Sequence, residues 1–402
     1  MKTKNRIKIS KLTKNLNACL FSILASSSIA HAASETIKIN IRAPLTDGAH
    51  ISPDGGTVVL SAPDDIPTLG DKNLYSDVIA FNTIKKTYSL ISLTTSGKPA
   101  NGDSSQPSVS AGGRYVAFQS SATNLIAKNT NGNQEIFLRD RVNKSTIAVS
   151  VSGNGTLAND NSFSPKISAD GRYVAFLSYA NNLVSGDINF SGDIFVRDLL
   201  TGQTQAASVD NAGHPVGGNF HIISNNGRYI AFSSTALQLK TNSNHAEDAY
   251  LHDRLTGTTV SISDNEAASV PGEMDYYLVG SISNDGKLAS IGHTKCTGTF
   301  HPSCTGESYI YNLGTKKKTN EKPGIISSNR QYMVYQGKDT TATNLSGIGI
   351  FVLNRLTGIT EKIPVDGYYI TLWGISANAQ NILYLKTPTP ADWPYFYVYR
   401  RY

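Results

Sequence analysis

Short apolar segments separated by polar turns recur along the chain, and three of them are nearly identical. The stretches VSAGGRYVAF, ISADGRYVAF and ISNNGRYIAF occupy residues 109–118, 167–176 and 223–232. In each, two apolar segments flank a turn rich in Asp, Asn and Gly. Asp and Asn side chains bond to their own backbone, and Gly accepts the positive φ that a tight hairpin requires. We therefore predict a strand, a turn and a second strand in every copy.

The full pattern occurs seven times. In each copy a serine follows Ile or Val, and a large apolar residue lies eight positions after that serine. The repeat serines are Ser52, Ser110, Ser168, Ser224, Ser283, Ser327 and Ser376. Their apolar counterparts are Leu60, Phe118, Phe176, Phe232, Ile291, Tyr335 and Tyr384. A repeat with a period of tens of residues is typical of a propeller or a solenoid.

A second motif follows most copies. It reads EIFLRDRVNKSTIAVSVS, DIFVRDLLTGQTQAASVD, DAYLHDRLTGTTVSISD and, less closely, GIFVLNRLTGITEKIPVD. This motif again predicts a strand, a turn and a strand, so each unit holds four short antiparallel strands. Residues 33–402 divide into seven units of about 53 residues. We predict an all-β chain that forms one domain, a seven-bladed β-propeller of four-stranded antiparallel blades.

The two ends of the domain complement each other. The last unit contains only three predicted strands, YITLWGIS, NILYLKT and YFYVYRRY. Residues 35–43 resemble the fourth-strand sequences of the other units. An open array would leave two exposed sheet edges, which soluble proteins avoid. We expect residues 35–43 to pair with the segment near Tyr395 to Arg400 and to close the ring.

The segments SPDGG, SADGRYVAF and SNDGK, with the IF-V-RD strands that follow such segments, resemble the repeat of TolB-like propellers. The resemblance extends over residues 33–402 and is closest in units two to four. It implies the propeller fold. TolB itself is a periplasmic binding protein with an additional α/β domain before its propeller. That domain is not expected here, so the resemblance does not imply the role of TolB in envelope assembly.

Residues 1–32 have the anatomy of a secretory signal peptide. Six basic residues precede the apolar segment ACLFSILASSSIA, and AHA ends at Ala32 as a small-x-small cleavage site. The whole chain has 36 basic and 30 acidic residues, and the leader holds six of the basic ones and no acidic one. The mature chain is therefore neutral overall. We expect a periplasmic or secreted monomer that binds no nucleic acid and inserts into no membrane after cleavage.

Cys296 and Cys304 are the cysteines that remain after cleavage. In an exported protein they are expected to form a disulfide that braces a long hairpin in blade five. Together with His293 and His301 they could instead chelate zinc. The exported context and the short span favour the disulfide.

Alternating oxygen side chains precede the third strand of the first four units. Blade one carries Asp71, Asn73 and Asp77, and blade three carries Asp187, Asn189 and Asp193. Blades two and four place Asn129, Asn131 and Glu135, and Asn242, Asn244 and Asp248, in the same register. Such loops collect the hard oxygen ligands of calcium. The alternative is a set of solvated Asx turns that shape the hairpin.

The loops between blades also repeat, as GKPANGDSS, GTLANDNSF and GHPVGGNFH. In a propeller they emerge on the same face as the loops between second and third strands. This face is polar with few charges, and its candidate ligand-binding residues are Asn101, Asp103, Asn159 and Asn161. Such a surface suits hydrogen-bonded recognition of a protein, peptide or glycan of the cell envelope, although solubility alone explains it equally well.

The sequence contains no G-x-S-x-G elbow, no H-E-x-x-H motif and no phosphate-binding loop. We therefore favour a non-catalytic binding or scaffold protein. A lyase or hydrolase acting on polysaccharide is the first alternative, with His214, His221, His252 and His293 as candidates for metal ligands. A lone strand histidine is more often structural. A calcium-dependent adhesin is the second alternative.

Overall fold

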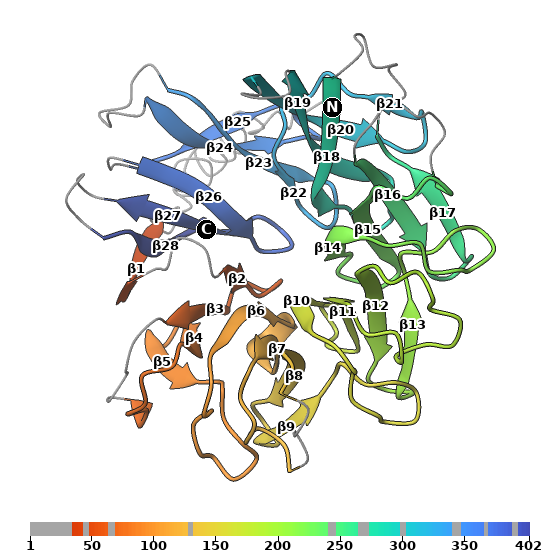
Figure 1. Cartoon of the computed structure of the whole chain (residues 1–402). Helices are drawn as coiled ribbons and strands as arrows, with labels where there is room; N and C mark the ends of the chain where they lie inside the picture. The colour runs from red at the N-terminus through yellow and green to blue at the C-terminus, as the bar shows by residue number, and fades with distance from the viewer. Residues whose placement is uncertain are drawn as a thin grey trace, which may run out of the picture.

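The structure is a computed structural model that describes residues 34–42, 48–62, 69–127, 132–239, 247–263, 273–297, 303–339, 347–365, 369–387 and 393–402. The proposed leader lies outside these residues. The described residues form seven four-stranded antiparallel sheets, arranged as the blades of a ring (Figure 1). They contain strands and short 3₁₀ turns such as η2 (Ala111–Gly113). The predicted all-β, seven-bladed propeller is confirmed. None of the described segments forms a helix long and apolar enough to cross a membrane.

The first four blades use short strands. Blade one consists of β2 (Ala49–Ile51), β3 (Thr57–Ala62), β4 (Asp77–Asn82) and β5 (Thr87–Leu90). Blade two consists of β6 (Ser104–Val109), β7 (Tyr115–Ser120), β8 (Glu135–Asp140) and β9 (Ser145–Ala148). Blade three consists of β10 (Ser162–Ile167), β11 (Tyr173–Ser178), β12 (Asp193–Asp198) and β13 (Gln203–Ala206). Blade four consists of β14 (Asn219–Ile223), β15 (Tyr229–Ser234), β16 (Asp248–Asp253) and β17 (Thr258–Ser261).

The last three blades are less regular. Blade five has ten-residue strands β18 (Glu273–Ile282), β19 (Leu288–Thr297) and β20 (Ser303–Asn312), followed by β21 (Lys317–Lys318). Blade six consists of β22 (Ile325–Ile326), β23 (Tyr332–Lys338), β24 (Ile348–Asn354) and β25 (Thr360–Ile363). Blade seven consists of β26 (Tyr369–Ile375), β27 (Asn381–Thr387), β28 (Tyr395–Arg400) and β1 (Glu35–Arg42).

The first strand of the domain closes the ring as predicted. β1 lies antiparallel to β28, and the register places Glu35 opposite Arg400 and Ile39 opposite Phe396. Figure 1 shows β1 at the outer edge of the sheet that carries the C-terminus. Ile37 and Ile39 are buried in the core that blades seven and one share. The strand thus covers the edge of β28 and contributes to the core between blades.

Apolar side chains fill the space between neighbouring blades. Val59 and Val78 of blade one pack with Val116, Phe118 and Phe137 of blade two. An equivalent cluster joins blade two to blade three. This arrangement explains the apolar residue eight positions after each repeat serine. It lies on the second strand and faces the sheet of the preceding blade, as Phe118 and Phe176 do.

The innermost strands of blades two, three and four bulge where they line the central channel. Gln106, Ser164 and Phe220 have φ values of 51°, 53° and 37°. The pairing register of each strand is interrupted at the same place. Bulges of this kind redirect the side chains that follow them. They therefore decide which side chains reach the channel.

Candidate functional site

The predicted binding residues lie in two interlocked sets of loops. Asn101, between blades one and two, accepts hydrogen bonds through Oδ1 from the backbone N–H groups of Thr123 and Asn124 at 2.8 and 3.2 Å. Asn159 repeats this contact one blade later, where its Oδ1 accepts the N–H of Asn181 at 3.1 Å. The between-blade loops and the second-to-third-strand loops thus share one face. We name it the loop face.

Asp103 and Asn161 are equivalent residues that fix the start of the third strand. Asp103 Oδ1 accepts the N–H of Ser76 at 2.9 Å, and Asn161 Oδ1 accepts that of Gln134 at 2.8 Å. Together with Asn101 and Asn159, they use side-chain oxygens to hold the loops together. Their first role in the structure is therefore to make the loop face rigid.

The loop face also presents apolar side chains that the sequence analysis did not single out. Leu74 is 90% exposed, Ile188 is 80% exposed and Phe190 is 91% exposed. Phe190 has φ 55°, a conformation that is costly for a bulky residue. Asn189 holds the turn, since its Oδ1 accepts the N–H of Ser191 at 2.8 Å and its Nδ2 donates to Asp193. An exposed aromatic ring thus projects from a hydrogen-bonded turn among polar loops.

The blade-one oxygen cluster is buried rather than solvated. Asp71 and Asp77 are both fully buried, and the Oδ2 atom of each has no hydrogen-bond partner among the described residues. Asp71 Oδ1 accepts the Nδ2 of Asn73 at 2.5 Å, and Asp77 Oδ1 accepts the hydroxyl of Ser92. Burial, together with the charge of Asp71, raises the pKa of Asp77 to about 7. Two unpaired carboxylate oxygens in the protein interior favour either a shared proton or a cation.

The blade-three cluster repeats this arrangement with more hydrogen bonds. Asp193 accepts Ser208 Oγ at 2.6 Å, Gly217 N–H at 2.9 Å and Asn189 Nδ2 at 2.8 Å. Burial and the charge of Asp193 raise the pKa of Asp187 to about 6. The asparagines predicted for blades two and four lie outside the described residues. Within the described residues, no group of three or more His, Cys, Asp and Glu side chains could hold a metal ion.

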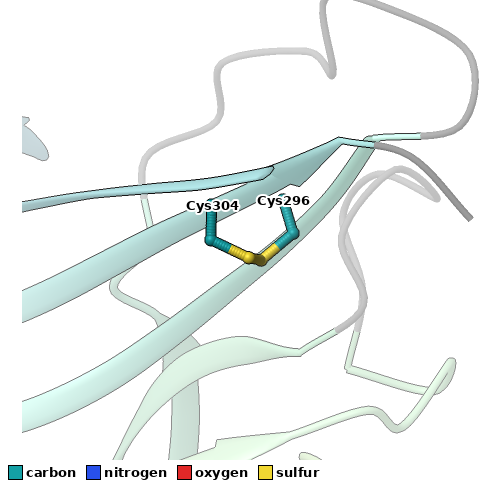
Figure 2. The surroundings of a disulfide bond; sticks show 2 residues. All are labelled: Cys296 and Cys304. Atoms are coloured by element: carbon teal, nitrogen blue, oxygen red, sulfur yellow. A yellow bond between two sulfur atoms is a disulfide. The ribbon is translucent and has the colours of Figure 1, made fainter. Parts of the chain in front are cut away.

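The cysteines form the predicted disulfide. Cys296 of β19 lies directly opposite Cys304 of β20, and their Cα atoms are 4.1 Å apart (Figure 2). The bond braces the long hairpin of blade five. It leaves no thiolate for the zinc alternative, and His301 lies outside the described residues.

The four candidate histidines have separate surroundings. His214 is exposed and hydrogen-bonds Asp210 at 3.2 Å. His252 is buried and hydrogen-bonds Thr259 at 3.0 Å. His293 stacks on Tyr277 at 4.3 Å between ring centroids. His221 is buried beside the channel, and its Nε2 atom has no hydrogen-bond partner among the described residues.

The central channel contains a cavity of about 400 Å³ lined by the innermost strands of all seven blades. Its charged or ionisable side chains are His50 of β2 and Lys166 of β10, and none of its described lining residues is acidic. Neither residue was expected from the sequence to belong to a site. The available signal was their position, because each lies two residues before a repeat serine.

Comparisons with known proteins support the fold. No family model matches the chain, and no curated protein matches it. Among solved structures, it is similar to an oligogalacturonate lyase from Vibrio parahaemolyticus, with 12% identity, a TM-score of 0.51, and coverage of 92% of this chain and 98% of the lyase. The hydrazine synthase of Kuenenia stuttgartiensis matches with 11% identity, a TM-score of 0.43, and coverage of 87% and 94%.

TolB from Acinetobacter baumannii matches with 13% identity and a TM-score of 0.42, over 78% of this chain and 64% of TolB. The chain therefore spans less than two thirds of the length of that protein. At these identities the likenesses concern the fold alone. The resemblance to TolB-like propellers expected from the repeats is confirmed at that level by the seven four-stranded blades.

Proposed function

We propose that this protein is an exported, non-catalytic binding or scaffold protein that recognises a protein, peptide or glycan of the cell envelope through its loop face. The observation that supports it most is Phe190. This side chain is 91% exposed, and its backbone is held at a positive φ. Exposed aromatic anchors carry much of the affinity at interfaces. Strain that the surrounding hydrogen bonds maintain is typical of functional positions.

The rigidity of the loop face adds to this argument. Asn101, Asp103, Asn159 and Asn161 hold the loops to one another, so little conformational entropy is lost when a partner binds. Leu74 and Tyr75 of blade one are exposed on the same face. The polar groups between these apolar side chains would supply hydrogen bonds at the rim.

The test is capture of partners from the envelope fraction by the immobilised protein. We expect Phe190→Ala combined with Tyr75→Ala to lower capture at least tenfold. The matched control is Leu200→Ala, because Leu200 is 75% exposed and lies on the turn between β12 and β13, at the opposite face. Treatment of the fraction with protease or glycosidase separates a protein partner from a glycan. Capture that survives the double substitution would contradict the proposal.

A second candidate is calcium-dependent binding by the same face. It is supported by the buried carboxylates of Asp71 and Asp77, whose unpaired Oδ2 atoms lie at the base of the loop that presents Leu74 and Tyr75. A bound calcium ion would neutralise this pair and fix the loop. Thermal unfolding with and without calcium tests it.

A further inference from the structure

Among the described polar side chains that line the central channel two residues before a repeat serine, Lys166 is the one that does not bond to the neighbouring blade. The position two residues before each repeat serine lines the cavity in every blade, and we name these seven residues the channel ring. They are His50, Ser108, Lys166, Ile222, Ser281, Ile325 and Gly374. Because the blades are related by the repeat, these seven positions lie at one level of the channel.

The polar members of the channel ring serve a structural purpose. His50 Nδ1 accepts the N–H of Val109 at 3.2 Å, and Ser108 Oγ accepts that of Ile167 at 3.0 Å. Ser281 Oγ accepts the N–H of Ile326 at 3.1 Å. Each acceptor thus ties its own blade to the innermost strand of the next blade.

Lys166 cannot accept a backbone N–H from the next blade, because an ammonium group has donors and no acceptor. It is partly buried, and no described residue that lines the cavity offers it a carboxylate. Burial lowers the pKa of its ammonium group. Removing a cation from water without an anionic partner is costly. The blade-to-blade bonds therefore do not explain this lysine, whereas an anionic ligand does.

Two further polar groups lie beside Lys166. Because His50 Nδ1 accepts a backbone N–H, the neutral ring of His50 carries its proton on Nε2 and can donate a hydrogen bond. His221 lines a second cavity of about 290 Å³ that Lys166 also lines, and its buried Nε2 has no partner among the described residues. Burial, and then the charge of Lys166, lower the pKa of both rings to about 3, so they stay neutral beside the ammonium group.

Apolar side chains from blades four, six and seven also line the channel. Ile222 and Ile325 belong to the ring itself, and Trp373 lies next to it in the same cavity. The indole of Trp373 is fixed because its Nε1–H donates to the carbonyl of Ala49 at 2.7 Å. A cavity whose lining combines an ammonium group with apolar side chains suits a ligand that has both a charged group and an apolar body.

We propose that the central channel binds a small organic carboxylate, with its charged group at Lys166 and His50 and its apolar body against Ile222, Ile325 and Trp373. The ammonium group and the Nε2–H donor supply charge-assisted hydrogen bonds. This site is separate from the loop-face residues, so either proposal can fail without the other.

Trp373 provides the readout. The chain has two tryptophans, and Trp393 is exposed, so Trp393→Phe leaves the channel indole as the fluorescent reporter. Phenylacetate is the probe, phenylacetamide is its uncharged counterpart, and inorganic phosphate is an anion without an apolar body. We expect phenylacetate to change the fluorescence of Trp373 saturably, and both other compounds to bind at least tenfold more weakly.

Substitution of Lys166 is the second part of the test. Calorimetry measures phenylacetate binding independently of fluorescence, on protein that retains both tryptophans. Lys166→Met should weaken phenylacetate binding at least tenfold, while the exposed Lys72→Met should leave it unchanged. Lys166→Ser, which copies Ser108 and Ser281, should raise the melting temperature without ligand and abolish its increase with phenylacetate. Equal affinity in Lys166→Met, no saturable signal, or phosphate binding as tight as phenylacetate would overturn the proposal.

Discussion

At the scale of single residues, the repeat serines explain why one pattern recurs seven times. Each serine Oγ accepts the backbone N–H five residues later, at 2.8 to 3.1 Å. In Ser168 the hydroxyl also donates to Asp170 at 2.5 Å, which fixes its orientation. The serine therefore closes the turn between the first and second strands. The serine recurs because every blade needs the hydrogen bond that closes this turn.

Replacing one repeat serine should measure this requirement. Ser168→Ala removes the acceptor of the Tyr173 N–H, and we expect a loss of about 1–2 kcal/mol in the free energy of unfolding in urea. Ser185→Ala, at an exposed serine of a neighbouring loop, is the control and should change stability by less than about 0.5 kcal/mol. Equal stability of the two variants would show that the hydroxyl is dispensable.

Arg–Asp pairs connect the second strand to the third strand in blades two, three and four. Arg114 contacts both oxygens of Asp140, at 3.1 and 2.8 Å, and the same contact joins Arg172 to Asp198 and Arg228 to Asp253. The guanidinium group of Arg114 holds the pKa of Asp140 at about 2. These pairs account for the Asp that ends the third-strand motif and for the Arg of the RY dipeptide.

The stability of the fold at acidic pH should depend on the Arg114–Asp140 pair. A depressed carboxylate pKa contributes stability above its unfolded value, near 3.9, and that contribution is lost as the pH falls through about 2. Asp140→Asn should therefore be less stable than the unmodified protein at pH 7, and the difference should shrink toward pH 2. Urea unfolding at pH 7, 4 and 2 measures it. A difference that stays constant with pH would show that the charge of Asp140 has no part in it.

At the scale of elements, the third strand of blades one, two and three begins with an acid that bonds a serine two residues after the fourth strand. Asp77 pairs with Ser92, Glu135 with Ser150, and Asp193 with Ser208. This shared contact is structural. What distinguishes blades one and three is a second buried carboxylate, Asp71 or Asp187, and the calcium hypothesis depends on this addition.

Calcium should bind the blade-one pair in a pH-dependent way. The pKa of Asp77 is raised to about 7 in the folded protein, whereas its unfolded value is near 3.9, so the fold loses stability as the pH rises from about 4 to about 7. A cation would offset this loss. We expect calcium to raise the melting temperature at pH 8 and to have a smaller effect at pH 5. Asp71→Asn should abolish the effect, whereas Asp160→Asn, at an exposed loop residue, should not. No calcium effect at pH 8 would indicate a shared proton instead.

At the scale of the whole molecule, the ring is held closed by residues from both ends of the domain. β1 pairs with β28 along its length, and Arg400 contacts Glu35 of β1 as well as the carbonyl of Thr83 in blade one, at 3.5 and 3.2 Å. Ile39 is fully buried in the shared core. The strand joins blade seven to blade one and covers an edge that would otherwise be open.

Deleting residues 34–42 should expose the edge of β28. We expect a lower melting temperature and concentration-dependent association, measured by light scattering, because an unpaired edge strand is a template for other chains. A synthetic peptide of residues 34–42, added in excess, should reduce the association, whereas a scrambled peptide should not. A deletion variant that stays monomeric and equally stable would show that closure does not depend on β1.

The sequence by itself determined the local elements and their number. The turn residues, the repeat serines and the apolar residues after them act within one hairpin, so the pattern identifies each strand pair without knowledge of its neighbours. The three-stranded last unit and the strand sequence at residues 35–43 together predicted closure of the ring. The expected export of the protein predicted the pairing of Cys296 with Cys304. These features are either local or visible as similar strand sequences at the two ends. The structure confirms the strands, the closure and the disulfide.

Only the tertiary structure decided which residues the side chains at the repeated positions contact. Asn101 and Asn159 turned out to hold loops together, and Asp71 and Asp77 turned out to be buried, because both outcomes depend on loops from neighbouring strands and blades. The meeting of His50 and Lys166 in the channel requires three blades to be in place at once. Closure of the ring brings distant residues to one level of the channel, and a repeat pattern read along the chain does not contain that proximity.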